Sequence, residues 1–125
     1  MKRTTGAIGA VVAALTVLAP TAAAKDGDIE AAGTCTRATT SELKLGDEDG
    51  AIEVEFEVDQ NRNGVRWVVT LHRNGVLVGT RSRVTRGPSG SLEVRFVARN
   101  GLGADRFVAR AARVGERCVA RASFA

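Results

Sequence analysis

The strongest constraint on the fold is a strict alternation of apolar and acidic residues over Ile52–Asp59. Each class of residue recurs at every second position. A period of two is typical of a β-strand with one buried and one solvated face, because successive side chains point to opposite sides. A second run, Val65–Leu71, places Val65, Trp67, Val69 and Leu71 at alternate positions, and Val68 is the one apolar residue on its outward face. The two runs predict a pair of strands whose apolar faces form the centre of the core.

Five further segments have the composition of short strands: Thr34–Leu45, Val76–Thr85, Ser91–Arg99, Arg106–Arg113 and Arg117–Phe124. The dipeptide Asn74-Gly75 is typical of a two-residue type I′ hairpin between two strands. About seven strands in roughly 100 residues predict an all-β fold. The expected architecture is an immunoglobulin-like antiparallel β-sandwich, as in immunoglobulin and fibronectin-III domains. In that fold residues 60–64 cross from one sheet to the other. A hairpin at Asn63-Gly64 is the alternative.

The first 24 residues have the order of a secretory signal peptide. A basic start precedes an apolar run over residues 7–18, which is too short to span a membrane, and an Ala-x-Ala site ends at Ala24. We expect cleavage there, a flexible leader over residues 25–33 and a β-sandwich domain over residues 34–125. The expected location is secreted and extracellular, and we expect no transmembrane segment in the mature chain.

Only two cysteines occur, Cys35 and Cys118, one near each end of the expected domain. In an exported protein an even pair of cysteines predicts a disulfide. A metal site or a catalytic thiol is the alternative, but His72 is the only histidine and no Cys-x-x-Cys motif is present. We therefore expect a bond between the two cysteines, no metal ligands and no cofactor.

Charge is distributed unevenly along the chain. Residues 25–59 carry eleven acidic and three basic side chains, whereas residues 60–125 carry thirteen basic and three acidic ones. One interpretation is that acidic and basic strands are neighbours and their charges pair across a sheet. The other interpretation is that an anionic partner binds the basic half.

Several arginines are predicted to face outward if their strands share one sheet: Arg66, Arg106, Arg110, Arg117 and Arg121. Such a face suits a polyanion, for example a nucleic acid, an anionic wall polymer or lipid head groups. Aromatic residues that would stack on bases are scarce, with one Trp and no Tyr. The alternative is that arginine serves only as the solvating cation of the surface.

The segment Asp59–Gly64 reads DQNRNG, which fits the first half of a calcium-binding loop. The twelfth position of that motif is Thr70 instead of glutamate, and Arg62 places a positive charge beside the would-be ion. The alternative is a tight turn built from residues that tolerate left-handed backbone.

Loops, rather than the sheets, are expected to carry any ligand contact. The sandwich places three of them at one end: Asp59–Gly64, Arg86–Gly90 and Val114–Glu116. Within these loops we expect Asp59, Arg62 and Arg86 to contact the ligand.

Several stretches resemble a group of small exported actinobacterial proteins of unknown function. They are EVEFEVDQNRNGxRW over Glu53–Trp67, TRGPSG over Thr85–Gly90, and the two flanking cysteines. The resemblance covers nearly all of the chain after residue 24. It implies secretion and a β-sandwich, and it implies no activity and no catalytic residues.

The sequence therefore predicts a non-enzymatic binding or structural module whose ligand or protein partner is unknown. A polyanion- or calcium-binding domain is the first alternative. A hydrolase would need His72 buried beside an acidic partner, and no nucleophile motif such as G-x-S-x-G is present. An enzyme inhibitor would need a rigid exposed loop, for which Arg86-Gly87-Pro88 is the candidate.

Overall fold

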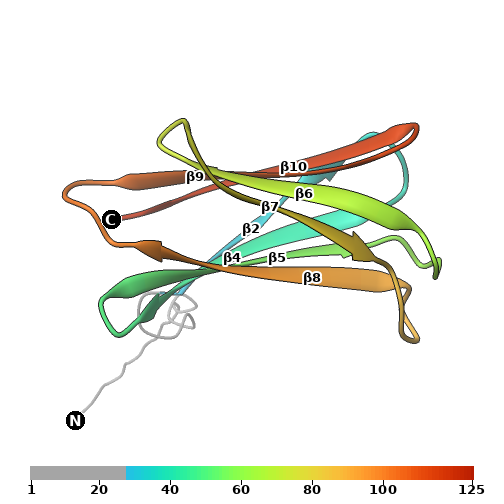
Figure 1. Ribbon diagram of the computed structural model, residues 1–125, viewed down its shortest axis with the longest axis horizontal. Helices are drawn as coiled ribbons and strands as arrows, with labels where there is room; N and C mark the ends of the chain where they lie inside the picture. Colours follow the sequence, from blue (N-terminus) through green and yellow to red (C-terminus); the bar gives the residue numbers. More distant parts are fainter. Residues whose placement is uncertain (1–27) are drawn as a thin grey trace, which may run out of the picture.

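The computed structural model describes residues 28–125, which form two antiparallel sheets packed face to face (Figure 1). The four-stranded sheet has the order β2 (Ile29–Ala32), β4 (Thr40–Glu48), β5 (Ala51–Asp59) and β8 (Ser91–Arg99). The five-stranded sheet has the order β3 (Thr34–Cys35), β10 (Glu116–Phe124), β9 (Asp105–Arg113), β6 (Arg66–Arg73) and β7 (Val76–Val84). The prediction of an all-β antiparallel sandwich is confirmed, with nine strands in residues 28–125 instead of about seven. No helix in residues 28–125 is long and apolar enough to cross a membrane.

The core lies between the sheets and is built from the alternating apolar positions of both. The inner face of β5 and the facing residues of β6 are fully buried: Ile52, Val54, Phe56, Val58, Trp67, Val69 and Leu71 are all at 0% exposure. Strands β4, β8, β9 and β10 add their own alternate residues to the same cluster. The two alternating runs therefore form the centre of the core, as their patterns predict.

The chain crosses between the sheets after β5, so residues 60–65 are a crossover and not a hairpin (Figure 1). It crosses back between β7 and β8, and again between β8 and β9. The predicted hairpin at Asn74-Gly75 joins β6 to β7, and both residues have positive φ, 49° and 84°. A type I′ turn requires positive φ at both central positions, which Asn and Gly tolerate.

Trp67 anchors the end of the core that lies beside the crossover. Its indole Nε1 donates a hydrogen bond of 3.1 Å to Oε1 of Gln60, at the start of the crossover. The guanidinium of Arg113 lies 5.7 Å from the centre of the indole ring. The polar tip of this buried aromatic residue is therefore satisfied, as a buried indole requires.

The N-terminal part of the domain differs from the prediction in two ways. The predicted strand Thr34–Leu45 is two strands, because the chain leaves the five-stranded sheet after Cys35 and enters the four-stranded sheet at Thr40. The prediction of a flexible leader over residues 25–33 is wrong for Ile29–Ala32, since these residues form β2, which pairs with β4 and packs Ile29 against the core. The predicted signal peptide and residues 25–27 lie outside the described residues.

The predicted disulfide is present and joins Cys35 to Cys118 across 83 residues of sequence. The two cysteines are direct cross-strand partners of β3 and β10, with their Cα atoms 4.0 Å apart. Strand β3 has only two residues, so the covalent bond holds the start of the chain to the edge of the five-stranded sheet.

Candidate binding surface on the five-stranded sheet

The outer face of the five-stranded sheet carries the five arginines that the sequence predicted to share one surface. We call this surface the arginine face; its charged members are Arg66, Arg106, Arg110, Arg117 and Arg121. All five are exposed, and they come from β6, β9 and β10, which are neighbours in the sheet. The alternation that buries Phe107, Ala109 and Ala111 turns the arginines of β9 to the opposite, solvated side.

The strand register arranges four of these arginines in a regular row. Across β9 and β10, Arg117 is opposite Ala112, Arg110 is opposite Val119, Arg121 is opposite Val108, and Arg106 is opposite Ser123. Each arginine thus faces a small residue, and successive arginines alternate between the two strands in steps of two residues. A two-residue step along a strand is about 6.6 Å, so the row spans about 20 Å. We call Arg117, Arg110, Arg121 and Arg106, in that order, the arginine row.

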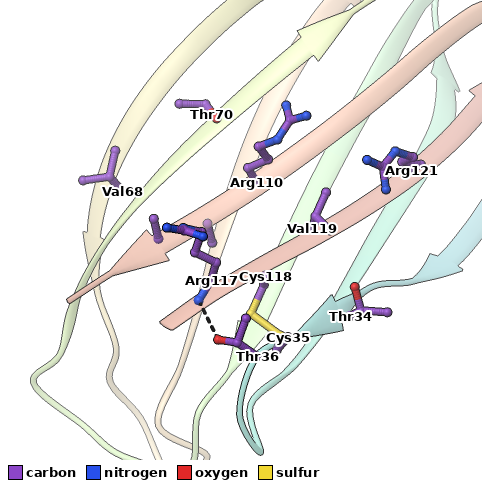
Figure 2. A pocket seen from close by; sticks show the side chains of 12 residues that line it. Thr34, Cys35, Thr36, Val68, Thr70, Arg110, Arg117, Cys118, Val119 and Arg121 are labelled. Carbon is purple, nitrogen blue, oxygen red and sulfur yellow. Dashed lines mark hydrogen bonds between the residues drawn. A yellow bond between two sulfur atoms is a disulfide. The ribbon is translucent and has the colours of Figure 1, made fainter. Parts of the chain in front are cut away.

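A groove of about 490 Å³ lies within this face, over β3, β6, β9 and β10. Figure 2 shows Arg110 and Arg121 on either side of Val119, with Thr70 and Val68 beyond Arg110 on the next strand. Arg117 lies next to the disulfide, and its backbone N–H donates a 3.0 Å hydrogen bond to Oγ1 of Thr36 (Figure 2). The groove therefore combines guanidinium groups with a floor of small apolar and threonine side chains.

None of the arginines on this face has a carboxylate partner within residues 28–125. The ion pairs of the described chain involve Arg73, Arg95 and Arg113 instead. The single side-chain hydrogen bond from a face arginine in this region is from Nη1 of Arg66 to Oγ of Ser82, at 2.9 Å. The alternate positions of β6, β7, β9 and β10 that point outward include no Asp or Glu. Five positive charges are therefore left without local neutralisation.

Carboxylates gather on the other side of the sandwich, on the outer face of the four-stranded sheet. We call this surface the acidic face; its acidic members are Glu30, Glu42, Glu48, Glu53, Glu55, Glu57, Asp59 and Glu93. Its basic residues are Lys44, Arg95 and Arg99. The prediction that acidic and basic strands pair across a sheet is wrong for most of these charges, because the crossover after β5 sends the acidic and basic strands to different sheets. It holds at Arg95, which pairs with Glu48 and Glu53.

Like charges on the acidic face lie directly opposite each other. Glu57 is the cross-strand partner of Glu42 on one side and of Glu93 on the other. Burial raises the pKa of Glu57, and the charges of Glu93, Asp59 and Glu42 raise it further. Burial and the charges of Glu93 and Glu53 likewise raise the pKa of Glu55. These carboxylates therefore carry an electrostatic cost that a cationic partner would relieve.

The loop residues predicted to contact a ligand lie at one end of the sandwich, where the crossover meets the β7–β8 loop (Figure 1). The backbone N–H of Gln60 donates to the carbonyl of Gly90 at 3.1 Å, and Thr85 Oγ1 donates to the carbonyl of Arg62 at 2.5 Å. Arg62 and Arg86 are exposed, and Asp59 is half-buried. The structure brings their loops together, and ligand contact by these three residues stays a prediction.

The motif that resembles a calcium loop forms a turn. Oδ1 of Asp59 accepts a 3.2 Å hydrogen bond from the backbone N–H of Asn61, which has a φ of 59°. Thr70, at the twelfth position, lies on β6 within the groove of the arginine face. In residues 28–125 no three His, Cys, Asp or Glu side chains are grouped so as to hold a metal ion.

His72 is half-buried on β6, and its Nδ1 is buried without a hydrogen-bond partner. Within residues 28–125 no carboxylate is hydrogen-bonded to it. The arrangement that a hydrolase would need around His72, a buried ring oriented by an acid, is therefore not formed by the described residues.

The arginine face was predicted from the sequence, but the order of the four arginines in the arginine row was not. Outward arginines follow from alternation within a strand, whereas the row depends on the register between β9 and β10, which the hairpin at Val114–Glu116 fixes. Comparison of the chain with family models, curated proteins and solved structures gives no match in any of the three.

Proposed function

We propose that the protein is an exported, non-enzymatic binding module that binds a linear polyanion on its arginine face. The observation that carries the proposal is a sheet face with five exposed arginines and no acidic residue. Guanidinium groups remain charged at all physiological pH values and present a planar set of donors that suits phosphate, sulfate and carboxylate groups. Several such groups on one surface raise the local concentration of anions.

The shape of the arginine row supports an extended ligand over a compact one. Four guanidinium groups spaced about 6.6 Å apart along the strands suit a chain that carries one negative charge per repeat of similar length. Val119 and Ala112 between the arginines leave room for the uncharged part of such a chain. The aromatic residues of the five-stranded sheet, Trp67, Phe107 and Phe124, are buried, so base stacking does not contribute and binding depends on charge rather than sequence.

Three features support export and an immunoglobulin-like architecture. A disulfide is typical of an oxidising compartment outside the cytosol. The N-terminal 24 residues have the order of a signal peptide, as in the small exported actinobacterial proteins that the chain resembles. The third, sixth and seventh of the predicted strands, here β6, β9 and β10, lie in one sheet, as strands C, F and G do in immunoglobulin domains.

The proposal is tested by titrating a fluorescent single-stranded oligonucleotide with protein at several salt concentrations. If the four arginines of the row each neutralise one phosphate, the slope of log K against log salt is about −2.8. The double variant Arg110→Gln/Arg121→Gln should reduce the magnitude of the slope to about 1.4 and weaken binding at low salt.

The matched control is the double variant Arg62→Gln/Arg86→Gln, which removes the same charge from the loop end. It should leave the slope unchanged. A slope that falls in the loop variant and not in the arginine-face variant would assign binding to the loops. Absence of salt-dependent binding in the unaltered protein would refute the proposal.

A second candidate, inhibition of a protease, has support from the β7–β8 loop. Arg86, Gly87 and Pro88 are exposed at the tip of this loop. Two backbone hydrogen bonds between Arg86 and Ser91, of 2.9 and 3.1 Å, close its base. A rigid loop that presents arginine suits proteases whose specificity pocket contains an aspartate. Inhibition of trypsin that is lost in Arg86→Ala would support this function, and absence of inhibition by the unaltered protein would exclude it for proteases of this specificity.

A further inference from the structure

The acidic face carries a row of charges that matches the arginine row. Strand β5 turns Glu53, Glu55, Glu57 and Asp59 outward, one at every second residue. The step between them is therefore the same two-residue step, about 6.6 Å, and the row has the same span of about 20 Å. Two rows of four opposite charges with equal pitch lie on opposite sides of one molecule. We call this second set the acidic row.

We propose that copies of this chain stack face to face, with the arginine row of one copy lying on the acidic row of the next. The contact is heterologous, since it joins two different surfaces, and a pair of copies keeps one unused arginine face and one unused acidic face. Assembly of this type does not close at two copies and gives short linear stacks. The inference is independent of the proposed polyanion ligand, although both use the arginine face.

Charge complementarity is the main support for this partner. The arginine face has five bases and no acid, whereas the acidic face has eight acids and three bases. The cost of the opposed carboxylates at Glu57 would be relieved by guanidinium groups placed over them. Each face also has one exposed valine, Val68 at 43% and Val97 at 51% exposure, which adds apolar area to the contact.

The size of the faces sets the strength of the association. Strands of nine residues are about 30 Å long, and four adjacent strands are about 19 Å wide. The contact would bury about 570 Å² on each partner, or about 1,100 Å² in total, which is at the low end for specific interfaces. We therefore expect weak association that depends on salt, because exposed ion pairs are screened over about 10 Å at 0.1 M ionic strength.

Complementary charge reversals test the inference by sedimentation velocity on protein with its disulfide intact. One variant, Arg110→Glu/Arg121→Glu, loses the arginine row and keeps the acidic row. The other, Glu55→Lys/Glu57→Lys, loses the acidic row and keeps the arginine row. The unaltered protein should show a weight-average mass at least twofold above the monomer at about 20 mM salt, and the monomer mass at about 0.5 M salt.

Each variant alone should remain monomeric at low salt, because it has lost one of the two surfaces. An equimolar mixture should contain species of at least twice the monomer mass, since the intact arginine face of one variant can lie on the intact acidic face of the other. Circular dichroism of each variant checks that the sandwich is retained. A monomeric unaltered protein at low salt, or a mixture that stays monomeric, would overturn the inference.

The same variants separate this inference from the proposed ligand. Glu55→Lys/Glu57→Lys keeps the arginine face and should bind the oligonucleotide at least as tightly as the unaltered protein. If it binds the oligonucleotide but does not associate with the arginine-face variant, self-association is refuted and polyanion binding stands. If the two variants associate but the unaltered protein does not bind the oligonucleotide, polyanion binding is refuted and self-association stands.

Discussion

Reduction of the disulfide should remove a large part of the stability of the domain. The bond between Cys35 and Cys118 closes 83 residues of chain. In the chain-entropy model a loop of this length stabilises the folded state by about 4.5 kcal/mol at 25 °C. Domains of this size have total stabilities of about 5–15 kcal/mol, so between a third and most of the stability depends on this bond.

The structure adds a local reason for a large effect. Strand β3 pairs with β10 through only two residues, and Thr36 adds two hydrogen bonds with Arg117, so without the covalent bond few contacts hold residues 34–36 to this sheet edge. Each kcal/mol shifts Tm by about 4–8 °C in a domain of this size, so reduction should lower Tm by about 18–36 °C. Thermal unfolding followed by circular dichroism, with and without reductant, measures the shift.

The control is the double variant Cys35→Ala/Cys118→Ala, whose Tm should be low and should not respond to reductant. A shift below about 5 °C on reduction of the unaltered protein would refute the reasoning. It would mean that the ends of the chain are held mainly by the sheets and not by the disulfide.

Three further predictions concern single sites. Arg73→Met should lower the free energy of unfolding in urea by about 3–5 kcal/mol, because Asp105 is 1% exposed and would keep an unpaired buried charge. Asp105→Asn should lower it by less, because Arg73 is 26% exposed and can turn to solvent. Equal losses in the two variants would contradict this. Gly90→Ala should destabilise far more than Gly87→Ala, because a Cβ at Gly90 would clash with the backbone of Arg62 in the crossover, whereas a Cβ at Gly87 would meet open space. Similar Tm values for the two variants would contradict the close approach of the loops. Glu57→Gln should raise the free energy of unfolding by about 0.2–1 kcal/mol at pH 7. Burial and neighbouring carboxylates raise the pKa of Glu57, so its charge destabilises the fold once the pH is high enough to ionise it. The stability gained by Glu57→Gln should therefore vanish near pH 3, where the glutamate is protonated.

The all-β fold was predictable because the sequence has the alternating pattern of strands with one buried and one solvated face. Ile52–Asp59 buries one complete face, Val65–Leu71 buries Trp67, Val69 and Leu71, and the link between the two runs is polar. The disulfide was predictable because the sequence has only two cysteines, and an even pair predicts a disulfide in a chain that is expected to be exported. Outward arginines on β9 and β10 followed from the same alternation.

Features that depend on pairing between strands were not predictable from one sequence. Strand β2 was missed because only Ile29 and Ala31 alternate in a polar segment, and their burial depends on β4. The irregularity in the pairing of β6 with β7, between Leu71 and His72, has no signal in the sequence pattern. The separation of charge between the two faces was missed because it depends on which strands share a sheet.

The central claim, that the arginine face is the binding surface, is tested most directly by mapping amide chemical shifts of labelled protein during titration with a single-stranded oligonucleotide. We predict saturable shifts at Arg106–Ala112 and Arg117–Arg121 that disappear at high salt. Saturable shifts confined to residues 59–64 and 86–90, at the loop end of the sandwich, would contradict the claim.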